Sequence, residues 1–456
     1  MDEREHWGSK IGFIMATAGS AVGLGSLWRF PYVIGTNGGG AFVLLYLFFT
    51  LLIGIPLFVA EVIVGRASQK SAVEGYSLLS RTSDWRILGW LNMITTFIVL
   101  SYYSVVSGWA CNYTLMSLAN FSQGKTPEEI RAIWDLVYTS GGTSLLWQGF
   151  FLAMSGGVVY GGIRKGIEYW SQIFMPLLFG FLLLLFFFAT TLPGFSEAMH
   201  FTLAPKFSEM GSASVLDALG MAFWTLSVGM GIILTYGSYM NKEEDIPQTG
   251  MLIALISCLV SLVAALMIFS VVFSFGFQPS SGPGLIFETL PVLFSQLPGT
   301  LIFSTLFFLL FLFAALTSAI SLLEVLVANL IDVFALERKT AVLCSLVAVF
   351  IFGIPSALSG SSQLFPEWEA IYGKTFFATM DYLASSWLMP IGGLSCAIFV
   401  GWIMDQKVAK REFLFGTQLT RLPMLWFFCV RWLVPLAILV IILQEAEVFD
   451  VSYFIR

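Results

Sequence analysis

Residues 19–25 read GSAVGLG, and residues 225–231 read TLSVGMG. Each stretch places a Gly-x-Gly pair, Gly23 with Gly25 and Gly229 with Gly231, near the middle of a long apolar run. A glycine inside a helix costs about 1 kcal/mol relative to alanine, so paired glycines favour local unwinding. The two stretches therefore predict two helices that are broken near their centres.

The composition places these helices in a membrane. Of the 456 residues, 57% are hydrophobic and 11% are charged, and the mean hydropathy is +0.86. Apolar runs near or above the ~18 residues that cross a bilayer recur along the whole chain. The expected fold is an all-α polytopic membrane protein with eleven transmembrane helices. Their expected ranges are 11–34, 41–65, 87–119, 144–162, 167–191, 215–239, 249–277, 300–334, 340–359, 376–404 and 423–443.

The charges in the loops predict the orientation. If the N-terminus is cytoplasmic, most Lys and Arg residues of the loops lie on the cytoplasmic side, which is the side that membrane proteins prefer for them. The Lys and Arg residues of the opposite loops are Lys125, Arg131, Lys206, Lys374 and Arg456. We therefore expect a multi-pass protein of the cell (plasma) membrane with a cytoplasmic N-terminus.

The two glycine stretches also suggest an internal repeat. They belong to the first and sixth expected helices, and a unit with an odd number of helices is inverted in the membrane when it is repeated. We expect a single transmembrane domain over residues 1–456, with a first repeat at 11–191, an inverted second repeat at 215–404 and an extra eleventh helix at 423–444. The two breaks would then face each other at mid-membrane.

Unwound backbone inside a bilayer exposes carbonyl oxygens, which attract a cation, and helix N-terminal NH groups, which attract a carboxylate. The alternative is that the glycines only permit close helix packing. Arg29 favours a cavity, because an arginine within the membrane needs a polar or charged partner, and Asp381 is a candidate. The hydroxyls of Thr317 and Ser318 could bind a hard cation or bond to their own helix.

Several motifs together resemble the neurotransmitter:sodium symporter family. They are REHW at 4–7, GSAVGLG at 19–25, WRFP at 28–31, NGGGAF at 37–42, GIP at 54–56 and AALTS at 314–318. The resemblance extends over nearly the whole chain. It implies a LeuT-type fold, a 5+5 inverted repeat with helices 1 and 6 unwound, and sodium-coupled symport of amino acids by alternating access. Bacterial members carry amino acids, so a bacterial inner membrane is also implied.

The resemblance implies two sodium sites of unequal completeness. One would use carbonyl and hydroxyl oxygens of Gly19, Val22, Ala314, Thr317 and Ser318. The other would use the carbonyl of Ala21 and the side chain of Thr225, but Ser26 and Ser257 stand where the family has two asparagines. The loss of both amide oxygens leaves the occupancy of the second site open.

The same correspondence implies a substrate pocket. Its residues are Ala21, Gly25, Val99, Tyr103, Trp224, Thr225, Ser227, Met230, Ser318 and Leu322. Tyr103 would bond to the substrate carboxylate and close over it. Val99, Met230 and Leu322 offer apolar walls without charge, so a hydrophobic or aromatic L-amino acid fits best. Trp224 replaces the gating phenylalanine of the family and suggests a bulkier lid.

Two gates also follow from the resemblance. Making and breaking ion pairs on alternate sides would separate two states by a few kcal/mol, which ion and substrate binding can bias. The outer gate would pair Arg29 with Asp381. The inner gate would consist of Arg4, Asp332, Trp7 and Tyr239.

The need for chloride stays open. Tyr46, Thr225 and Ser261 match positions that bind chloride in some members of the family, but Met221 stands where those members have glutamine. Glu61, within the second expected helix, is interpreted first as a structural acceptor that caps a broken helix. Its alternative role is that of a proton carrier.

Other classes of function fit less well. The net charge of −6 and the lack of a basic patch argue against nucleic-acid binding. The only histidines, His6 and His200, form no HExxH motif, and we expect no enzyme. A channel or an amino-acid sensor could share a broken-helix ion site and is the alternative function. The expected partners are a small amino-acid substrate and the lipid bilayer, with the protein a monomer or a weak homodimer.

Overall fold

The computed structural model describes residues 4–80, 82–211, 214–277, 284–297, 299–361, 364–419 and 421–446. These residues form helices joined by loops, and no strand occurs among them. The prediction of an all-α protein is therefore confirmed. Arg456, one of the charges used to predict the orientation, lies outside the described residues.

The first five expected membrane segments coincide with one helix each or with consecutive helices. They are α1 (Lys10–Ala21), η1 (Gly25–Arg29) and α2 (Phe30–Thr36); α3 (Gly40–Phe49), η2 (Thr50–Gly54) and α4 (Ile55–Ser68); α6 (Arg86–Leu118); α8 (Gly141–Tyr160); and η4 (Ile163–Glu168) with α9 (Tyr169–Ala189). Short helices connect or follow them, namely α5 (Ala72–Leu78), η3 (Ser83–Trp85), α7 (Pro127–Thr139) and α10 (Phe195–Leu203).

The later segments follow the same pattern. They are α11 (Ser214–Leu226) with α12 (Ile232–Gly237); α13 (Ile246–Ser274); α15 (Thr300–Phe334); α16 (Arg338–Ala357); α18 (Phe376–Tyr382), η7 (Leu383–Leu388), α19 (Met389–Ile398) and η8 (Phe399–Ile403); and α21 (Pro423–Phe428), η9 (Cys429–Leu433) and α22 (Val434–Glu445). The shorter elements are η5 (Phe207–Glu209), η6 (Leu285–Thr289), α14 (Leu290–Ser295), α17 (Trp368–Tyr372) and α20 (Gln406–Leu414).

Eight helices of the described chain are long and apolar enough to cross a membrane. The first segment, bent by 45° at its break, makes a ninth. The other two expected segments, α8 and the pair α11 and α12, are helical, and their membrane crossing stays a prediction. Two helices begin three residues before the expected ranges because polar side chains cap them: Ser140 accepts from the NH of Thr143, and Asp245 accepts from the NH of Gln248.

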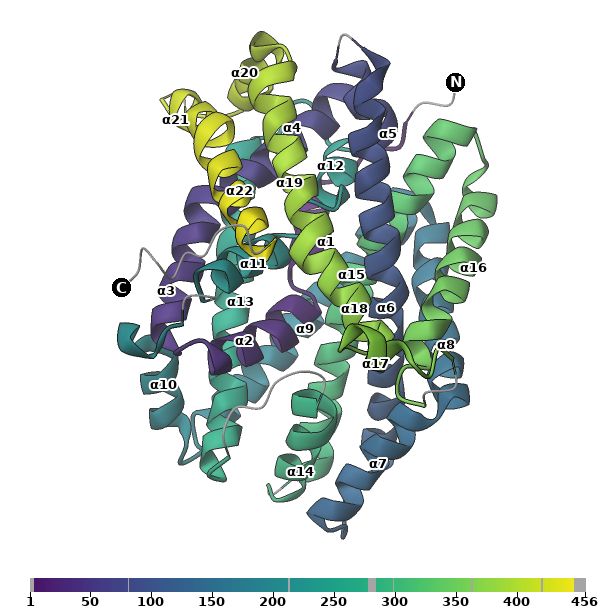
Figure 1. Cartoon of the computed structure of the whole chain (residues 1–456), viewed down its shortest axis with the longest axis vertical. Helices are drawn as coiled ribbons and strands as arrows, with labels where there is room; N and C mark the ends of the chain where they lie inside the picture. Colours follow the sequence, from purple (N-terminus) through teal and green to yellow (C-terminus); the bar gives the residue numbers. More distant parts are fainter. Residues whose placement is uncertain are drawn as a thin grey trace.

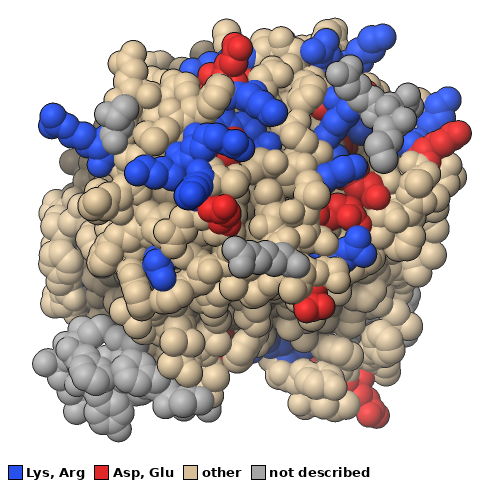
Figure 2. Space-filling model, turned by 90° about the horizontal axis from the view of Figure 1, so that it is seen from above, with Lys and Arg blue, Asp and Glu red and all other residues tan. Residues whose placement is uncertain are grey.

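The short connecting helices mark the two ends of the bundle (Figure 1). The N-terminal end of the chain, α5 and α20 lie at one end, and α7, α10 and α14 lie toward the other. Lys and Arg side chains gather on the first of these ends (Figure 2). This distribution agrees with the expected cytoplasmic side, and the assignment of the sides stays a prediction.

Both helix breaks lie inside the bundle. The helix α1 packs against α15, α9 and α13, and α12 packs against α4. Val22 in the first break and Val228 in the second are fully buried. Burial in protein is a condition for unwound backbone at membrane depth, because lipid offers no hydrogen-bond partners.

Candidate functional site

The first break comprises Val22, Gly23 and Leu24, between α1 and η1. A Cβ at Gly23 would lie 2.1 Å from Oγ of Ser318 and 3.2 Å from the hydroxyl of Tyr103, so only glycine fits here without a shift of its neighbours. The NH of Leu24 donates to the Tyr103 hydroxyl at 3.4 Å. The break thus brings backbone NH groups and two side-chain hydroxyls into one small space.

The second break lies between α11 and α12. Gly229 and Gly231 have φ angles of 83° and 76°, a conformation that favours glycine. The NH of Gly229 donates to Oε1 of the buried Glu61 at 2.6 Å, and Oγ1 of Thr96 donates to the carbonyl of Met230 at 2.6 Å. Side chains of α4 and α6 thereby replace helical hydrogen bonds that the break removes.

The oxygens expected to form the first sodium site meet where α1 crosses α15. Oγ of Ser318 lies 3.3 Å from the carbonyl oxygen of Gly19, and Oγ1 of Thr317 lies 3.1 Å from that of Ala314. A Cβ at Gly19 would lie 3.0 Å from Cβ of Thr317, so the helices are in close contact. Val22 caps the C-terminus of α1 beside them. Such a set of hydroxyl and carbonyl oxygens fits a hard cation such as sodium.

The residues expected to form the second sodium site separate into two groups. Oγ of Ser26 donates to the carbonyl of Ala21 at 3.3 Å. Oγ of Ser257 donates to the carbonyl of Thr225 at 2.7 Å, and Oγ1 of Thr225 donates to the carbonyl of Met221 at 3.0 Å. A serine side chain is shorter than asparagine, so its oxygen stays close to nearby backbone. In the first set, by contrast, the Ser318 hydroxyl bonds from α15 across to α1.

The hydroxyls at the possible chloride positions are also engaged within the protein. The Tyr46 hydroxyl donates to Oγ1 of Thr225 at 3.0 Å. Oγ of Ser261 donates to the carbonyl of Ser257 at 2.9 Å. With the Thr225 hydroxyl bonded to the Met221 carbonyl, each of the three matched hydroxyls directs its proton to a protein oxygen.

A cavity of about 30 Å³ lies between the two breaks. The expected substrate residues that line it are Ala21, Gly25, Val99, Tyr103, Trp224, Ser227, Met230, Ser318 and Leu322. Thr225 is buried and does not line this cavity, because its hydroxyl faces Tyr46 and its own helix. The sequence did not single out four further lining residues, Ser20, Gly23, Leu24 and Ile232, although all four lie within or next to the glycine stretches.

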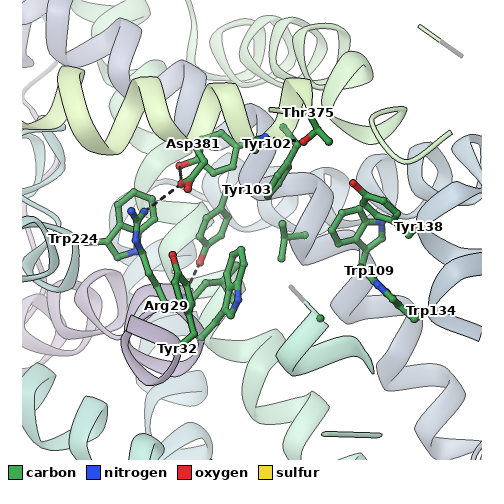
Figure 3. Close-up of a pocket in the computed structure, with 16 residues that line it drawn as sticks. Arg29, Tyr32, Tyr102, Tyr103, Trp109, Trp134, Tyr138, Trp224, Thr375 and Asp381 are labelled. Carbon is green, nitrogen blue, oxygen red and sulfur yellow. Dashed lines mark hydrogen bonds and ion pairs between the residues drawn. The ribbon is translucent and has the colours of Figure 1, made fainter. Parts of the chain in front are cut away.

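The expected outer ion pair lies beside Trp224, one of the residues that line this cavity (Figure 3). Nη1 of Arg29 is 3.3 Å from Oδ1 of Asp381, which also accepts from the Tyr102 hydroxyl at 3.0 Å. The Arg29 guanidinium lies over the indole of Trp224, 4.9 Å from its centroid. A Cβ at Gly25 would lie 2.0 Å from Cδ1 of Trp224. The indole is thus held between Gly25, at the start of η1, and the ion pair.

A larger cavity of about 380 Å³ adjoins the small one, and Arg29 and Asp381 line it together with several aromatic side chains (Figure 3). Leu24, Tyr103 and Trp224 line both cavities. These three side chains therefore form the partition between the two spaces.

The family model described as the sodium:neurotransmitter symporter family matches residues 4–125 and 138–454. The chain belongs to this family. An uncharacterized sodium-dependent transporter, YhdH of Bacillus subtilis (strain 168), is 40% identical over 439 residues, which are 96% of this chain and 97% of the relative. The sodium-dependent dopamine transporter of Caenorhabditis elegans is 26% identical over 82% of this chain and 71% of its own length.

A solved structure gives the same result for the fold. The crystal structure of MhsT in complex with L-phenylalanine matches this symporter with a TM-score of 0.90 and 37% identity, over 97% of this chain and 99% of MhsT. The chain is thus a multi-pass membrane protein with the LeuT-type fold, a sodium-dependent transporter of a small molecule and not an enzyme.

The end of the symporter that we expect to be cytoplasmic also carries an ion pair. Nη1 of Arg4 is 2.7 Å from Oδ2 of Asp332, and Nζ of Lys70 is 3.6 Å from the other oxygen. The Arg4 guanidinium lies 4.7 Å from the ring centroid of Tyr239. The backbone NH of Trp7 donates to the Tyr239 carbonyl at 3.1 Å. The four residues expected at the inner gate therefore lie together.

The sequence missed the next layer of this inner cluster. The Tyr239 hydroxyl donates to Oε1 of Glu324 at 2.6 Å, and the other oxygen of Glu324 pairs with Arg338. Glu324 is fully buried in α15. A carboxylate inside an expected membrane helix was the available signal, because such groups need a charged or polar partner. Arg338 gave no signal because it resembles any other basic loop residue.

Proposed function

We propose that this symporter imports hydrophobic or aromatic L-amino acids with sodium by alternating access. The observation that carries the proposal is the chemistry of the small cavity. Polar groups come from the first break and from the hydroxyls of Tyr103, Ser227 and Ser318, whereas Val99, Met230 and Leu322 supply apolar surface. No charged side chain is among its described lining residues. A charged substrate side chain would lose its hydration without finding a partner.

The substrate carboxylate would bind at the first break. The NH of Leu24 and the Tyr103 hydroxyl already contact each other there, so both are within reach of one anion. The apolar side chain would extend toward Met230 under the indole of Trp224. MhsT, 37% identical, has been crystallised with L-phenylalanine, which supports a substrate of this class.

Sodium would bind where α1 meets α15, at Gly19, Val22, Ala314, Thr317 and Ser318. The cation would stabilise the contact between the two helices and the conformation of the break that binds the substrate. The second set, Ala21, Ser26, Thr225 and Ser257, is proposed as a weaker site. Chloride is proposed to be unnecessary, because the hydroxyls that would bind it are engaged with protein oxygens.

The two ion pairs would act as gates. Arg29 with Asp381 and Arg4 with Asp332 are both formed here, a combination that suits an intermediate closed on both sides. A channel would need both gates open together. The cytoplasmic N-terminus, the bacterial inner membrane, the repeats at 11–191 and 215–404 with the extra helix 423–444, and a monomer or weak homodimer remain predictions.

A competition experiment tests the proposed substrate class. Uptake of labelled L-phenylalanine into proteoliposomes is driven by an inward sodium gradient, and unlabelled amino acids are added in excess. Leucine, tryptophan and tyrosine should suppress the uptake, whereas lysine and glutamate should not. Equal suppression by lysine or glutamate would contradict an uncharged apolar pocket. A parallel measurement with gluconate in place of chloride should give the same uptake.

A further inference from the structure

A groove of about 520 Å³ lies at the end of the bundle that we expect to be cytoplasmic. It separates α20 from the start of α21, two elements that lie near each other at the top of Figure 1. We call it the α20/α21 groove. Its lining includes Gln406, Lys410, Arg421, Met424, Trp426 and Phe427.

The walls of the groove are fixed to the body of the protein. Nε of the buried Arg66 donates to Oε2 of Glu412 on α20 at 2.9 Å. The rings of Phe413 and Trp426 lie 5.0 Å apart, and the Trp426 indole NH donates to the carbonyl of Pro56 at 3.0 Å. The groove is therefore a preformed feature of the fold rather than a gap between mobile loops.

The charge of the groove is positive. Lys410 and Arg421 are both exposed, and neither forms an ion pair with any residue that the structure describes. On the same short helix, Arg411 lies 3.5 Å from Oε1 of Glu412, whose other oxygen pairs with the buried Arg66, so this carboxylate is already engaged. The groove thus presents cations whose charge no described carboxylate of its lining neutralises.

The other part of the groove is apolar and continues into the membrane. Met424 is 85% exposed, and Leu425 and Phe428 are 59% and 55% exposed. All three belong to the last candidate span, Pro423–Glu445. Exposed apolar side chains on a membrane span contact lipid tails, and Arg421 precedes Met424 by three residues. The groove therefore lies where lipid tails end and headgroups begin.

We propose that the α20/α21 groove binds an anionic phospholipid. Its phosphate would contact Lys410 and Arg421, and its acyl chains would lie along Met424 and Phe427. Basic residues at the cytoplasmic membrane surface attract anionic lipid with about 1 kcal/mol each. A free anion would use only the cations, and a protein partner would have to compete with lipid for Met424. A phospholipid satisfies both parts of the groove together.

The test measures lipid binding to the purified full chain in detergent. The probes are phosphatidylglycerol, phosphatidylcholine and inorganic phosphate alone, and lipid retention is read by native mass spectrometry alongside thermal unfolding. Phosphatidylglycerol should bind and raise the unfolding temperature. The double variant Lys410→Gln with Arg421→Gln should weaken phosphatidylglycerol binding about thirtyfold. This is the change in affinity expected when two basic contacts are lost.

A matched control removes the same charge from the same end of the molecule. Lys165→Gln with Lys339→Gln changes exposed residues of η4 and α16, outside the groove, and should alter phosphatidylglycerol binding by less than about threefold. An equal loss in both double variants would overturn the proposal. Equal retention of phosphatidylcholine, full protection by inorganic phosphate, or a dimer that only the groove variants dissociate would overturn it as well.

Discussion

Gly25→Ala perturbs the contact between the first break and the indole of Trp224. A Cβ at residue 25 would lie 2.0 Å from Cδ1 and 2.3 Å from Nε1 of the indole. Carbon atoms in contact are normally about 3.5–4.0 Å apart, so the indole or the break must move by more than ~1 Å. Overpacking of this kind costs about 1–3 kcal/mol. Because both residues line the substrate cavity, we expect L-phenylalanine to bind roughly 5- to 150-fold more weakly.

The assay is equilibrium binding of labelled L-phenylalanine to purified protein in sodium chloride. Gly220→Ala is the matched control, since it lies one turn before Trp224 on α11 and a Cβ there meets nothing within 4 Å. Its affinity should stay within about twofold of the wild type, because it adds no overpacking. Both variants are first checked for wild-type thermal stability, so that weak binding is not a consequence of misfolding.

A double-mutant cycle tests the physical cause. Trp224→Leu removes the ring with which the new methyl group collides. In the Gly25→Ala background this second substitution should therefore cost less affinity than it does in the wild type. If Gly25→Ala binds as tightly as the wild type, or if the two losses simply add, the indole does not close the cavity in the way described.

Three further predictions concern the sodium site, the outer gate and Glu244 in the loop between α12 and α13. Alanine at both Thr317 and Ser318 removes two oxygen ligands and should raise the sodium concentration for half-maximal uptake by roughly tenfold or more; unchanged sodium dependence would exclude the site. Asp381→Ala should slow initial uptake more than alanine at Asp217, an exposed residue in the first turn of α11, because Asp381 forms the outer ion pair at 3.3 Å; equal effects would contradict this gate. Burial raises the pKa of Glu244, so its native state binds a proton more tightly than the unfolded chain, and stability falls as pH rises toward that pKa. Glu244→Gln should therefore raise the unfolding temperature more at about pH 8 than at about pH 5; equal shifts would argue against a buried charge.

The sequence predicts the fold well because bilayer thickness limits the length of each apolar run. It also predicts both breaks, because the paired glycines that favour unwinding, such as Gly23 and Gly229 with their partners two residues later, are visible in the sequence itself. It also predicts one of the side chains that satisfy the broken backbone: Glu61, expected to cap a broken helix, accepts from the NH of Gly229. It does not predict Thr96, which bonds to the carbonyl of Met230 from α6, because that contact depends on packing across the bundle.

The site illustrates the same limit at the level of single side chains. A resemblance in sequence assigns Thr225 to the substrate pocket, but its hydroxyl bonds to Met221 and Tyr46 instead. The direction of the Thr225 hydroxyl depends on the side-chain conformation, which the position of the residue in the sequence does not specify. The pairing of Glu324 with Arg338 was missed for a related reason, because the basic partner begins the next helix and looks like an ordinary loop charge.

Accumulation of L-phenylalanine against its concentration gradient is the most direct test of sodium coupling at the two helix breaks. Labelled L-phenylalanine is measured in proteoliposomes with sodium outside only, with equal sodium on both sides, and with potassium replacing sodium. The account predicts accumulation above the external concentration with the inward gradient, equilibration without accumulation when sodium is equal, and little uptake in potassium. Uptake of the same rate and extent in all three conditions would contradict it.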